Sequence, residues 1–376
     1  MVSIKSLEPY FEKQKCAIAV SSSNEYAKYL CVYLMSIKAF ADSNKYYDIV
    51  VFERDITDEN KEKIKLSIES NNISVRFFST KGIFDSYNLY ITHSYFKEEC
   101  YFRLVAPVIL NSYEKIIFTD LDLILNDDIL KLADIDLGDN VIAAAIEPIW
   151  RELYDCDLKI NGWCIKDYAD NVLKLSDKYE YYNMGVCVFN VQKYNLENSF
   201  EKIMKNIGNV KYLYQEQCAL NYYFKNRILK LPEIWNFEVD PTIINNNRDI
   251  LEYTEYKKQD VNAKIIHFLG PQKPWKNPYH YKSYLWWNSA KNTVFYEQIL
   301  YDMMLSESKK HLYNERLHYV IENIMLFRYK KFEYKIKKLI FQGKKREKYK
   351  NKYENIKQLI VDAKNLKKYF IDFNLL

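Results

Sequence analysis

The sequence predicts an α/β protein with a mainly parallel β-sheet and helices on both faces. Apolar runs at 16–23, 47–52 and 73–79 are typical of buried strands, and segments 24–40 and 57–70, with helical periodicity, lie between them. Strands that alternate with helices at this spacing are usually joined as parallel βαβ units. We therefore expect the N-terminal part of the chain to begin such a sheet.

The pattern continues along the chain and then changes. We expect a helix over 96–112, ended or kinked at Pro107, strands over 115–125, 141–147, 181–191 and 263–270, a helix over 214–221, and irregular chain over 242–249. From about residue 282 the pattern is helical to the end. This change predicts one α/β domain over residues 1–281 and a helical extension over residues 282–376.

Composition excludes several classes of protein. The 376 residues are 48% hydrophobic and include 35 Tyr and 20 Phe, which excludes disorder throughout. No apolar run is long enough to span a membrane, and the N-terminal segment lacks the apolar core of a signal peptide. The seven Cys include no CxxC pair, which favours reduced thiols in the cytoplasm over disulfides or a Cys-ligated zinc.

Charge is distributed unevenly. Residues 309–376 contain 19 Lys and Arg but 7 Asp and Glu, whereas the whole chain has a net charge of +5. The body is therefore acidic and the C-terminal part is basic. A basic tail on a soluble domain indicates contact with an anionic surface, which could be a membrane, a nucleic acid or an acidic glycan.

Two acids interrupt the apolar segment 115–125. Asp120 and Asp122 are two residues apart, and such residues of a strand project on one side. Two neighbouring carboxylates repel each other unless a cation lies between them, and oxygen ligands suit Mg²⁺ or Mn²⁺. The simpler interpretation is a pair of solvated carboxylates beyond a strand end.

With this motif, FTDLD, the sequence resembles glycosyltransferase family 8, which includes glycogenin and bacterial lipopolysaccharide and lipooligosaccharide galactosyl- and glucosyltransferases. The other matching motifs are SSSNEYA (21–27), YFRLVAP (101–107), YYNMGV (181–186) with YQEQCALN (214–221), and HFLGPQKPW (267–275). The resemblance covers residues 16–276. It implies a GT-A fold with a single Rossmann-like nucleotide-sugar-binding domain, and a UDP-hexose donor with Mn²⁺, or alternatively Mg²⁺, as cofactor.

The resemblance also implies roles for the donor-binding residues. His267 would be the third metal ligand beside Asp120 and Asp122, while Gly270 and Lys273 would hold the diphosphate. Gly lets the backbone approach phosphate and Lys supplies a point charge. The residues expected to contact the nucleotide are Ser21, Ser23, Asn24, Tyr26, Asp120 and Leu121. The family usually has an acid in the loop before Tyr26, and serines stand there in this chain.

A second group of residues would contact the donor sugar and serve catalysis. They are Arg103, Glu147, Asn183, Glu216 and Gln217. The family usually has Asp-Gln-Asp where this chain has Glu216, Gln217 and Cys218. Double displacement with retention needs a carboxylate nucleophile, and an amide, Gln217, lies at the matching place. We therefore expect retention by front-face attack, in which the departing diphosphate deprotonates the incoming hydroxyl.

These inferences predict an enzyme that moves galactose or glucose from a UDP-sugar to a cell-surface glycan or glycolipid. Segment 327–350 interleaves basic and aromatic residues, which favours peripheral binding to the inner face of a bacterial plasma membrane. The alternative for this segment is an oligomerisation arm. For the whole chain, the alternatives are a non-catalytic sugar-nucleotide-binding protein and, more remotely, a nucleic-acid-binding protein.

Overall fold

The computed structural model describes residues 5–12, 14–90, 98–154, 159–239 and 250–373. The chain forms two compact units, Met1–Glu297 and Gln298–Leu376. The functional boundary expected after residue 281 stays a prediction. Segment 242–249, expected to be irregular, lies outside the described residues.

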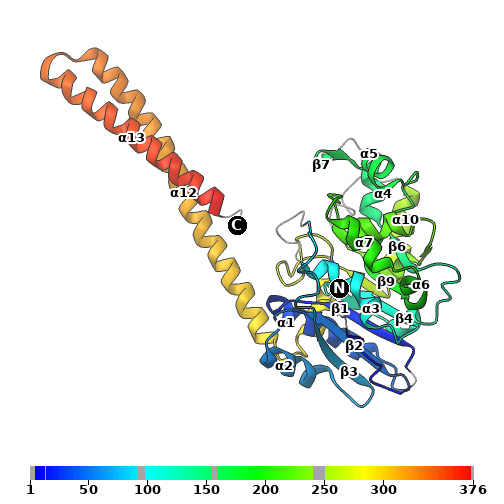
Figure 1. Ribbon diagram of the computed structural model, residues 1–376. Helices are drawn as coiled ribbons and strands as arrows, with labels where there is room; N and C mark the ends of the chain where they lie inside the picture. The colour runs from blue at the N-terminus through cyan, green and yellow to red at the C-terminus, as the bar shows by residue number, and fades with distance from the viewer. Residues whose placement is uncertain (1–4, 13, 91–97, 155–158, 240–249, 374–376) are drawn as a thin grey trace. The chain divides into compact units, whose positions relative to one another are not determined.

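A seven-stranded mixed sheet forms the centre of the first unit, in the order β10-β6-β9-β4-β1-β2-β3 (Figure 1). Its strands are β1 (Cys16–Ser21), β2 (Tyr47–Glu53), β3 (Ile73–Ser79), β4 (Lys115–Thr119), β6 (Ile142–Ile146), β9 (Tyr182–Asn190) and β10 (Ile228–Lys230). Neighbouring strands are parallel except that β9 runs antiparallel to both β4 and β6. The prediction of a mixed, mainly parallel sheet is confirmed.

Two groups of helices pack around this sheet. One contains α1 (Ala27–Phe40), α2 (Asp58–Ile68) and α11 (Ser283–Ala290), with α1 in contact with both others; the second contains α3 (Phe102–Ile109), α6 (Val191–Leu196) and α7 (Ser199–Ile207). Thr57 caps α2 by accepting a hydrogen bond from the Asn60 backbone N–H. Helix α3 continues through Pro107 to Ile109, so it ends two residues beyond the proline.

The strand expected over 115–125 is two strands in different sheets. After β4 the chain bends at Asp120–Asp122 and enters β5 (Leu123–Leu125), which belongs to a second sheet, β11-β12-β5. Its partners are β11 (Phe237–Glu238) and β12 (Ile265–His267). The expectation that one strand aligns the two carboxylates is therefore wrong, and a bend between two sheets brings them together.

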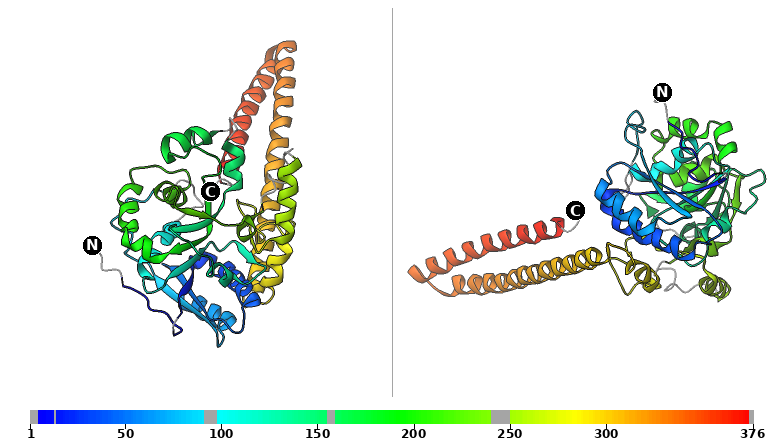
Figure 2. Two further views of the ribbon diagram at one scale, coloured as in Figure 1. Left: turned by 90° about the vertical axis from the view of Figure 1, so that its right-hand side faces the viewer. Right: turned by 90° about the horizontal axis from the view of Figure 1, so that it is seen from below.

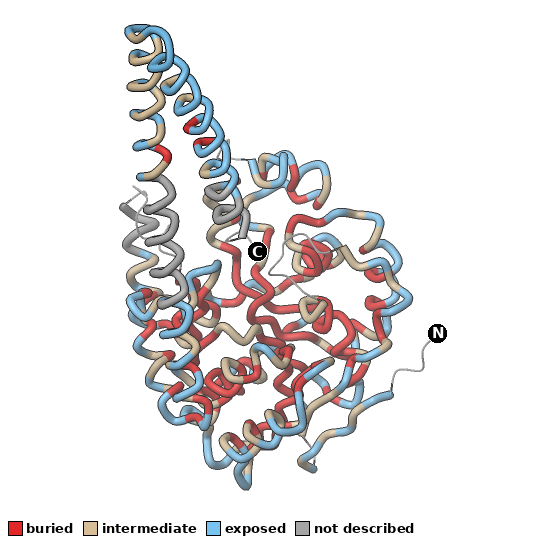
Figure 3. Tube along the Cα trace, turned by 90° about the vertical axis from the view of Figure 1, so that its left-hand side faces the viewer, coloured by how far each residue is buried: buried red, intermediate tan, exposed pale blue. Residues whose placement is uncertain are grey.

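Further elements, most of them short, complete the first unit. They are η1 (Asn24–Tyr26), η2 (Glu98–Tyr101), η3 (Ile129–Leu132), α4 (Pro148–Tyr154), β7 (Lys159–Ile160), β8 (Trp163–Cys164), α5 (Ile165–Tyr168), η4 (Ala169–Leu173), α8 (Gln215–Tyr223), η5 (Glu233–Asn236) and α10 (Ile250–Asn262). Buried residues concentrate on the central strands (Figure 3). The six cysteines among the described residues are free thiols.

The second unit is a helical hairpin, as the C-terminal pattern predicts. Helices α12 (Tyr296–Ile340) and α13 (Gly343–Phe373) run side by side and are joined at Gly343, whose φ of 57° favours glycine (Figure 2). The Tyr349 ring contacts Phe341 and Tyr334 across the hairpin, with ring centroids 5.3 and 6.3 Å away. Among the described residues, none of the helices is apolar over enough of its length to cross a membrane.

Candidate active site

Two carboxylates and one imidazole converge where the two sheets meet. The Asp120 N–H donates to Gly185 O on β9 (2.8 Å), and the Phe268 N–H donates to Asp122 O (3.0 Å), so the bend is tied to both sheets. His267 Nε2 lies 3.3 Å from Asp122 Oδ1 and 3.8 Å from Asp120 Oδ2. One potential ligand atom from each residue lies within 4.8 Å of the others, a spacing that suits one metal ion.

The residues present fit a divalent cation. His267 is buried, and its Nε2 atom has no hydrogen-bond partner among the described residues. A buried polar atom without a partner is costly, and a metal ion would satisfy it. Carboxylate oxygens with one imidazole suit Mn²⁺, and Mg²⁺ prefers the oxygens.

Each carboxylate also has its own cation. Arg103, which is buried on α3, pairs with Asp120 and also donates to Met184 O. Lys273 pairs with Asp122 and donates to Phe268 O at 2.6 Å. Burial disfavours the ionised Asp122, but the neighbouring Lys273 ammonium contributes to outweighing burial, so the pKa of Asp122 lies well below its usual range.

Glu216 is a buried carboxyl at the start of α8. Burial raises its pKa to about 7, although Arg103, whose Nε atom lies 3.5 Å from Glu216 Oε1, works in the opposite direction. A carboxyl whose pKa lies near neutrality can change protonation during a reaction. The sequence alone predicted contact with the sugar but not this altered pKa.

The remaining residues expected near the sugar lie around the same edge of the sheet. Gln217 Oε1 accepts from the Met184 N–H (2.9 Å), and its Nε2 donates to Tyr181 OH (3.2 Å). Asn183 is buried, with its amide bonded to Glu147 and to neighbouring backbone. Their contacts with a donor sugar stay predictions.

Cys218, the residue that departs from the family pattern, lies in the core. Burial raises the pKa of its thiol to about 11, although Tyr181 OH, 3.1 Å from the sulfur, works in the opposite direction. A neutral buried thiol offers no nucleophile at ordinary pH. We therefore expect Cys218 to take no nucleophilic part, and this stays a prediction.

The expected nucleotide loop follows β1. Ser22 and Ser23 are buried, while Ser21 and Tyr26 are half-buried. Asn24 Oδ1 accepts from the Thr57 N–H and from Asn60 Nδ2, which ties this loop to the start of α2. Leu121 is half-buried in the bend between the carboxylates.

Three residues that the sequence analysis did not single out also belong to this region. The Asn24 N–H donates to Asp55 Oδ1 (2.8 Å), so an exposed acid from the chain after β2 lies at the serine loop. Asn236 Oδ1 lies 2.9 Å from His267 Nδ1. A Cβ on Gly185 would lie 2.4 Å from His267 Cε1. The scarcity of glycine and the motif YYNMGV were signals for Gly185, whereas nothing in the sequence pointed to Asn236.

The fold and this site define the chain as a GT-A glycosyltransferase. Gly270, with φ of +70° and an open side, and Lys273 lie on the loop after β12, and their contact with a diphosphate stays a prediction. The profile of Glycosyl transferase family 8 matches residues 17–278. The chain belongs to this family.

Individual relatives are similar over most of the first unit. General stress protein A of Bacillus subtilis is 22% identical, with 73% of this chain and 96% of the relative covered. Lipopolysaccharide 1,3-galactosyltransferase of Salmonella typhimurium is 20% identical, with 58% of this chain and 63% of the relative covered. The structure of the bifunctional glycosyltransferase WbbM superposes with a TM-score of 0.72 at 27% identity, covering 80% of this chain and 53% of WbbM.

Proposed function

We propose that this enzyme transfers a hexose, galactose or glucose, from a UDP-sugar to a cell-surface glycan with retention of configuration. The observation that carries the proposal is the cluster of Asp120, Asp122 and His267, flanked by Arg103 and Lys273. Such a cluster suits a diphosphate leaving group because both a metal ion and a lysine can approach its oxygens.

Asp120, Asp122 and His267 would hold Mn²⁺, or alternatively Mg²⁺, which when bound supplies Lewis-acid stabilisation of the departing diphosphate. Lys273 adds a positive charge on the same loop as Gly270, which would carry the phosphates. Arg103 neutralises Asp120 and keeps it oriented. The nucleotide would be contacted by Ser21, Ser23, Asn24, Tyr26 and Leu121.

The chain's residues favour front-face attack. Double displacement needs a carboxylate, and at the position that the family resemblance assigns to it this chain has the amide of Gln217; Cys218, the next residue, is buried. In the proposed step the acceptor oxygen bonds to the anomeric carbon while the bond from that carbon to the phosphate oxygen breaks on the same face. The acceptor proton passes to the departing phosphate. Asn183, Glu147 and Glu216 would help hold the sugar.

A hydrolysis panel tests this function. Purified protein is incubated with UDP-galactose and UDP-glucose, with and without Mn²⁺, and thermal stability is followed with UDP. We expect stabilisation by UDP only with Mn²⁺, and slow hydrolysis of one sugar nucleotide. Binding without hydrolysis would support the non-catalytic alternative, and absence of both would contradict the proposed function.

The acceptor is proposed to be lipopolysaccharide, lipooligosaccharide or capsule, because the Salmonella relative is a lipopolysaccharide galactosyltransferase. Such an acceptor is lipid-linked at the membrane, so the enzyme would work in the bacterial cytoplasm at the inner face of the plasma membrane. The second unit is proposed to bind there.

An apolar stripe on α12 supports membrane binding. Its residues are exposed and recur with spacings of 4, 3, 4 and 3: Met325, Tyr329, Phe332, Ile336 and Leu339. This spacing places them on one face of a helix. Arg328 and Lys335 flank the stripe on one side, and Glu333, which pairs with Lys337, lies on the other.

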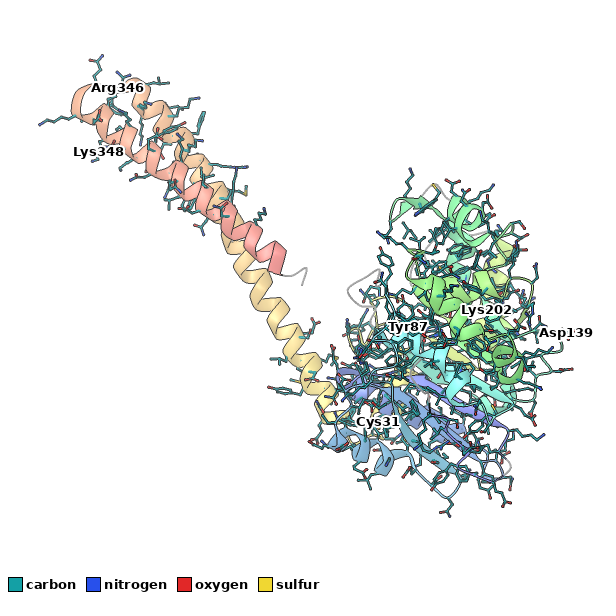
Figure 4. The ribbon with its side chains drawn as sticks, viewed as in Figure 1. Cys31, Tyr87, Asp139, Lys202, Arg346 and Lys348 are labelled. Atoms are coloured by element: carbon teal, nitrogen blue, oxygen red, sulfur yellow. The ribbon has the colours of Figure 1, made fainter. Side chains whose placement is uncertain are left out.

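The opposite face of α12 packs on α13, where Ile324 of α12 and Ile356 and Ile360 of α13 are buried. Further cations, including Arg346 and Lys348, project near the turn of the hairpin (Figure 4). Apolar side chains flanked by cations suit an anionic lipid surface, where each Lys or Arg contributes about 1 kcal/mol. Pairing of this stripe with a second copy of the chain, as an oligomerisation arm, stays the alternative.

A further inference from the structure

A continuous line of hydrogen bonds leads from the large sheet to the imidazole of His267. Asn183 Nδ2 donates to Glu147 Oε2 (2.8 Å), Asn236 Nδ2 donates to Asn183 Oδ1 (2.9 Å), and Asn236 Oδ1 lies 2.9 Å from His267 Nδ1. All four side chains are buried. The line joins β6 and β9 of the large sheet to β12 of the small sheet.

The direction of each hydrogen bond follows from the partners of Asn183. The Gly185 backbone N–H can only donate, and it points at Asn183 Oδ1 (2.7 Å). A carboxylate can only accept, so Asn183 must turn its NH₂ group toward Glu147. Both constraints select one orientation of the Asn183 amide, with its oxygen toward Asn236.

The orientation of Asn183 also fixes the orientation of Asn236 and the protonated nitrogen of His267. Because Asn183 presents an oxygen, Asn236 must present its NH₂ group to it, and Asn236 therefore turns its own oxygen toward His267. An oxygen at 2.9 Å requires a proton on His267 Nδ1. In the neutral imidazole, Nε2 then carries the lone pair, and this is the atom that faces Asp120 and Asp122 without a hydrogen-bond partner among the described residues.

We propose that Asn236, whose orientation is fixed by Asn183 and Glu147, is a positioning residue that holds His267 as the Nδ1–H tautomer and so presents Nε2 to the metal ion. The part of this inference that concerns the metal ion rests on the proposed metal-dependent function. The tautomer itself is a property of the metal-free protein. Partners of this kind typically change metal affinity by about 10- to 100-fold when removed.

The first measurement reads the tautomer directly. The protein is labelled with ¹⁵N-histidine and kept free of metal in alkaline buffer, where imidazole is neutral. The chain has 5 His, and the His267 signals are assigned by comparison with a His267→Gln variant. We expect the long-range ¹⁵N–¹H pattern of the Nδ1–H tautomer in the wild type, and loss of this pattern in Asn236→Leu.

The second measurement is Mn²⁺ affinity, followed by the electron paramagnetic resonance of free Mn²⁺, with and without UDP. We expect Asn236→Leu to bind Mn²⁺ about 10- to 100-fold more weakly. Asn221→Leu is the matched control: Asn221 is equally buried and accepts from the Tyr182 N–H (2.8 Å), apart from the line that reaches His267. This control should lose stability but keep the tautomer and the affinity.

The outcomes separate the inference from the function on which it rests. An Nε2–H pattern in the metal-free wild type overturns the inference whether or not any variant folds. A folded Asn236→Leu protein with wild-type tautomer and Mn²⁺ affinity also overturns it. If the wild type binds no Mn²⁺, the proposed function fails, and the part assigned to the metal fails with it.

Discussion

Gly185 and His267 approach each other so closely that a Cβ on Gly185 would lie 2.4 Å from His267 Cε1. This contact explains why the motif YYNMGV needs a glycine in the middle of a buried strand, where glycine is otherwise unfavourable. The imidazole that completes the metal cluster occupies the space of the missing side chain.

Gly185→Ala should therefore displace His267 and weaken Mn²⁺ binding by about tenfold or more, with a loss of roughly 1–3 kcal/mol in the free energy of unfolding. Titration with Mn²⁺ and urea unfolding measure the two effects. Gly208→Ala is the control, because its Cβ would lie 2.5 Å from Asn88 O, away from the cluster. Equal loss of metal affinity in both variants would contradict the role of Gly185.

Asp122→Asn should remove Mn²⁺-dependent hydrolysis of the sugar nucleotide, because a neutral amide is a much weaker ligand than a carboxylate. A metal ion contributes several kcal/mol, so activity should fall by at least roughly a hundredfold. Asp127→Asn is the matched control, since Asp127 pairs with Lys131 and Lys264 on the far side of β5. Wild-type activity of Asp122→Asn without added metal would refute the metal assignment.

Lys273→Ala should raise the affinity for one ligand, Mn²⁺, and lower the affinity for another, UDP. Lys273 pairs with Asp122 in the structure, so it competes with a cation, and its removal should raise the affinity for Mn²⁺ alone by roughly three- to tenfold. The affinity for UDP with Mn²⁺ should fall by about 1.5–3 kcal/mol, because a contact with a charged phosphate is lost. Calorimetry measures both, with the exposed Lys276→Ala as control. Unchanged UDP affinity would count against the diphosphate role.

Glu216 should make stability depend on pH. Its pKa rises from about 4.5 to about 7 on folding, so the folded protein keeps the proton that the unfolded chain releases. The contribution to stability is complete below about pH 4.5 and is lost as the pH rises to about 7. Relative to Glu216→Gln, the metal-free wild type should lose up to about 3 kcal/mol over this window in urea unfolding.

The exposed Glu62→Gln variant is the control for this pH dependence, since Glu62 lies on the solvent side of α2. Its difference from the wild type should stay constant over the same window. A constant difference for Glu216→Gln as well would show that Glu216 titrates normally.

Deletion from about residue 320 should abolish binding to anionic vesicles while sparing sugar-nucleotide hydrolysis, because the proposed site ends at Lys273. In the full chain, the combined substitutions Phe332→Ser, Ile336→Ser and Leu339→Ser should strongly reduce co-sedimentation with anionic vesicles, because they remove the apolar stripe. The matched control carries Leu359→Ser and Val361→Ser on α13, where both residues are also exposed. Equal binding of the full chain to anionic and neutral vesicles, or to neither, would exclude membrane binding by the tail.

The sequence by itself determined the class of fold, the order of the main strands and helices, and the helical character of the C-terminal part. These features follow from local periodicity, such as the alternation of apolar runs with the helical segments 24–40 and 57–70. Local periodicity can be read directly from the order of residues in the sequence. The motifs also predicted Asp120, Asp122 and His267 as the metal ligands, from residue type and order in the chain.

Only the tertiary structure decided how these residues meet. Asp120 and Asp122 lie in a bend between two sheets, and a β-strand register could not predict that bend because backbone bonds to Gly185 and Phe268 hold it. Asn236 reaches His267 from a short element without periodicity. The raised pKa of Glu216 depends on burial, which packing of distant segments creates. Contacts between residues far apart in the chain leave no local pattern, so the tertiary fold alone reveals them.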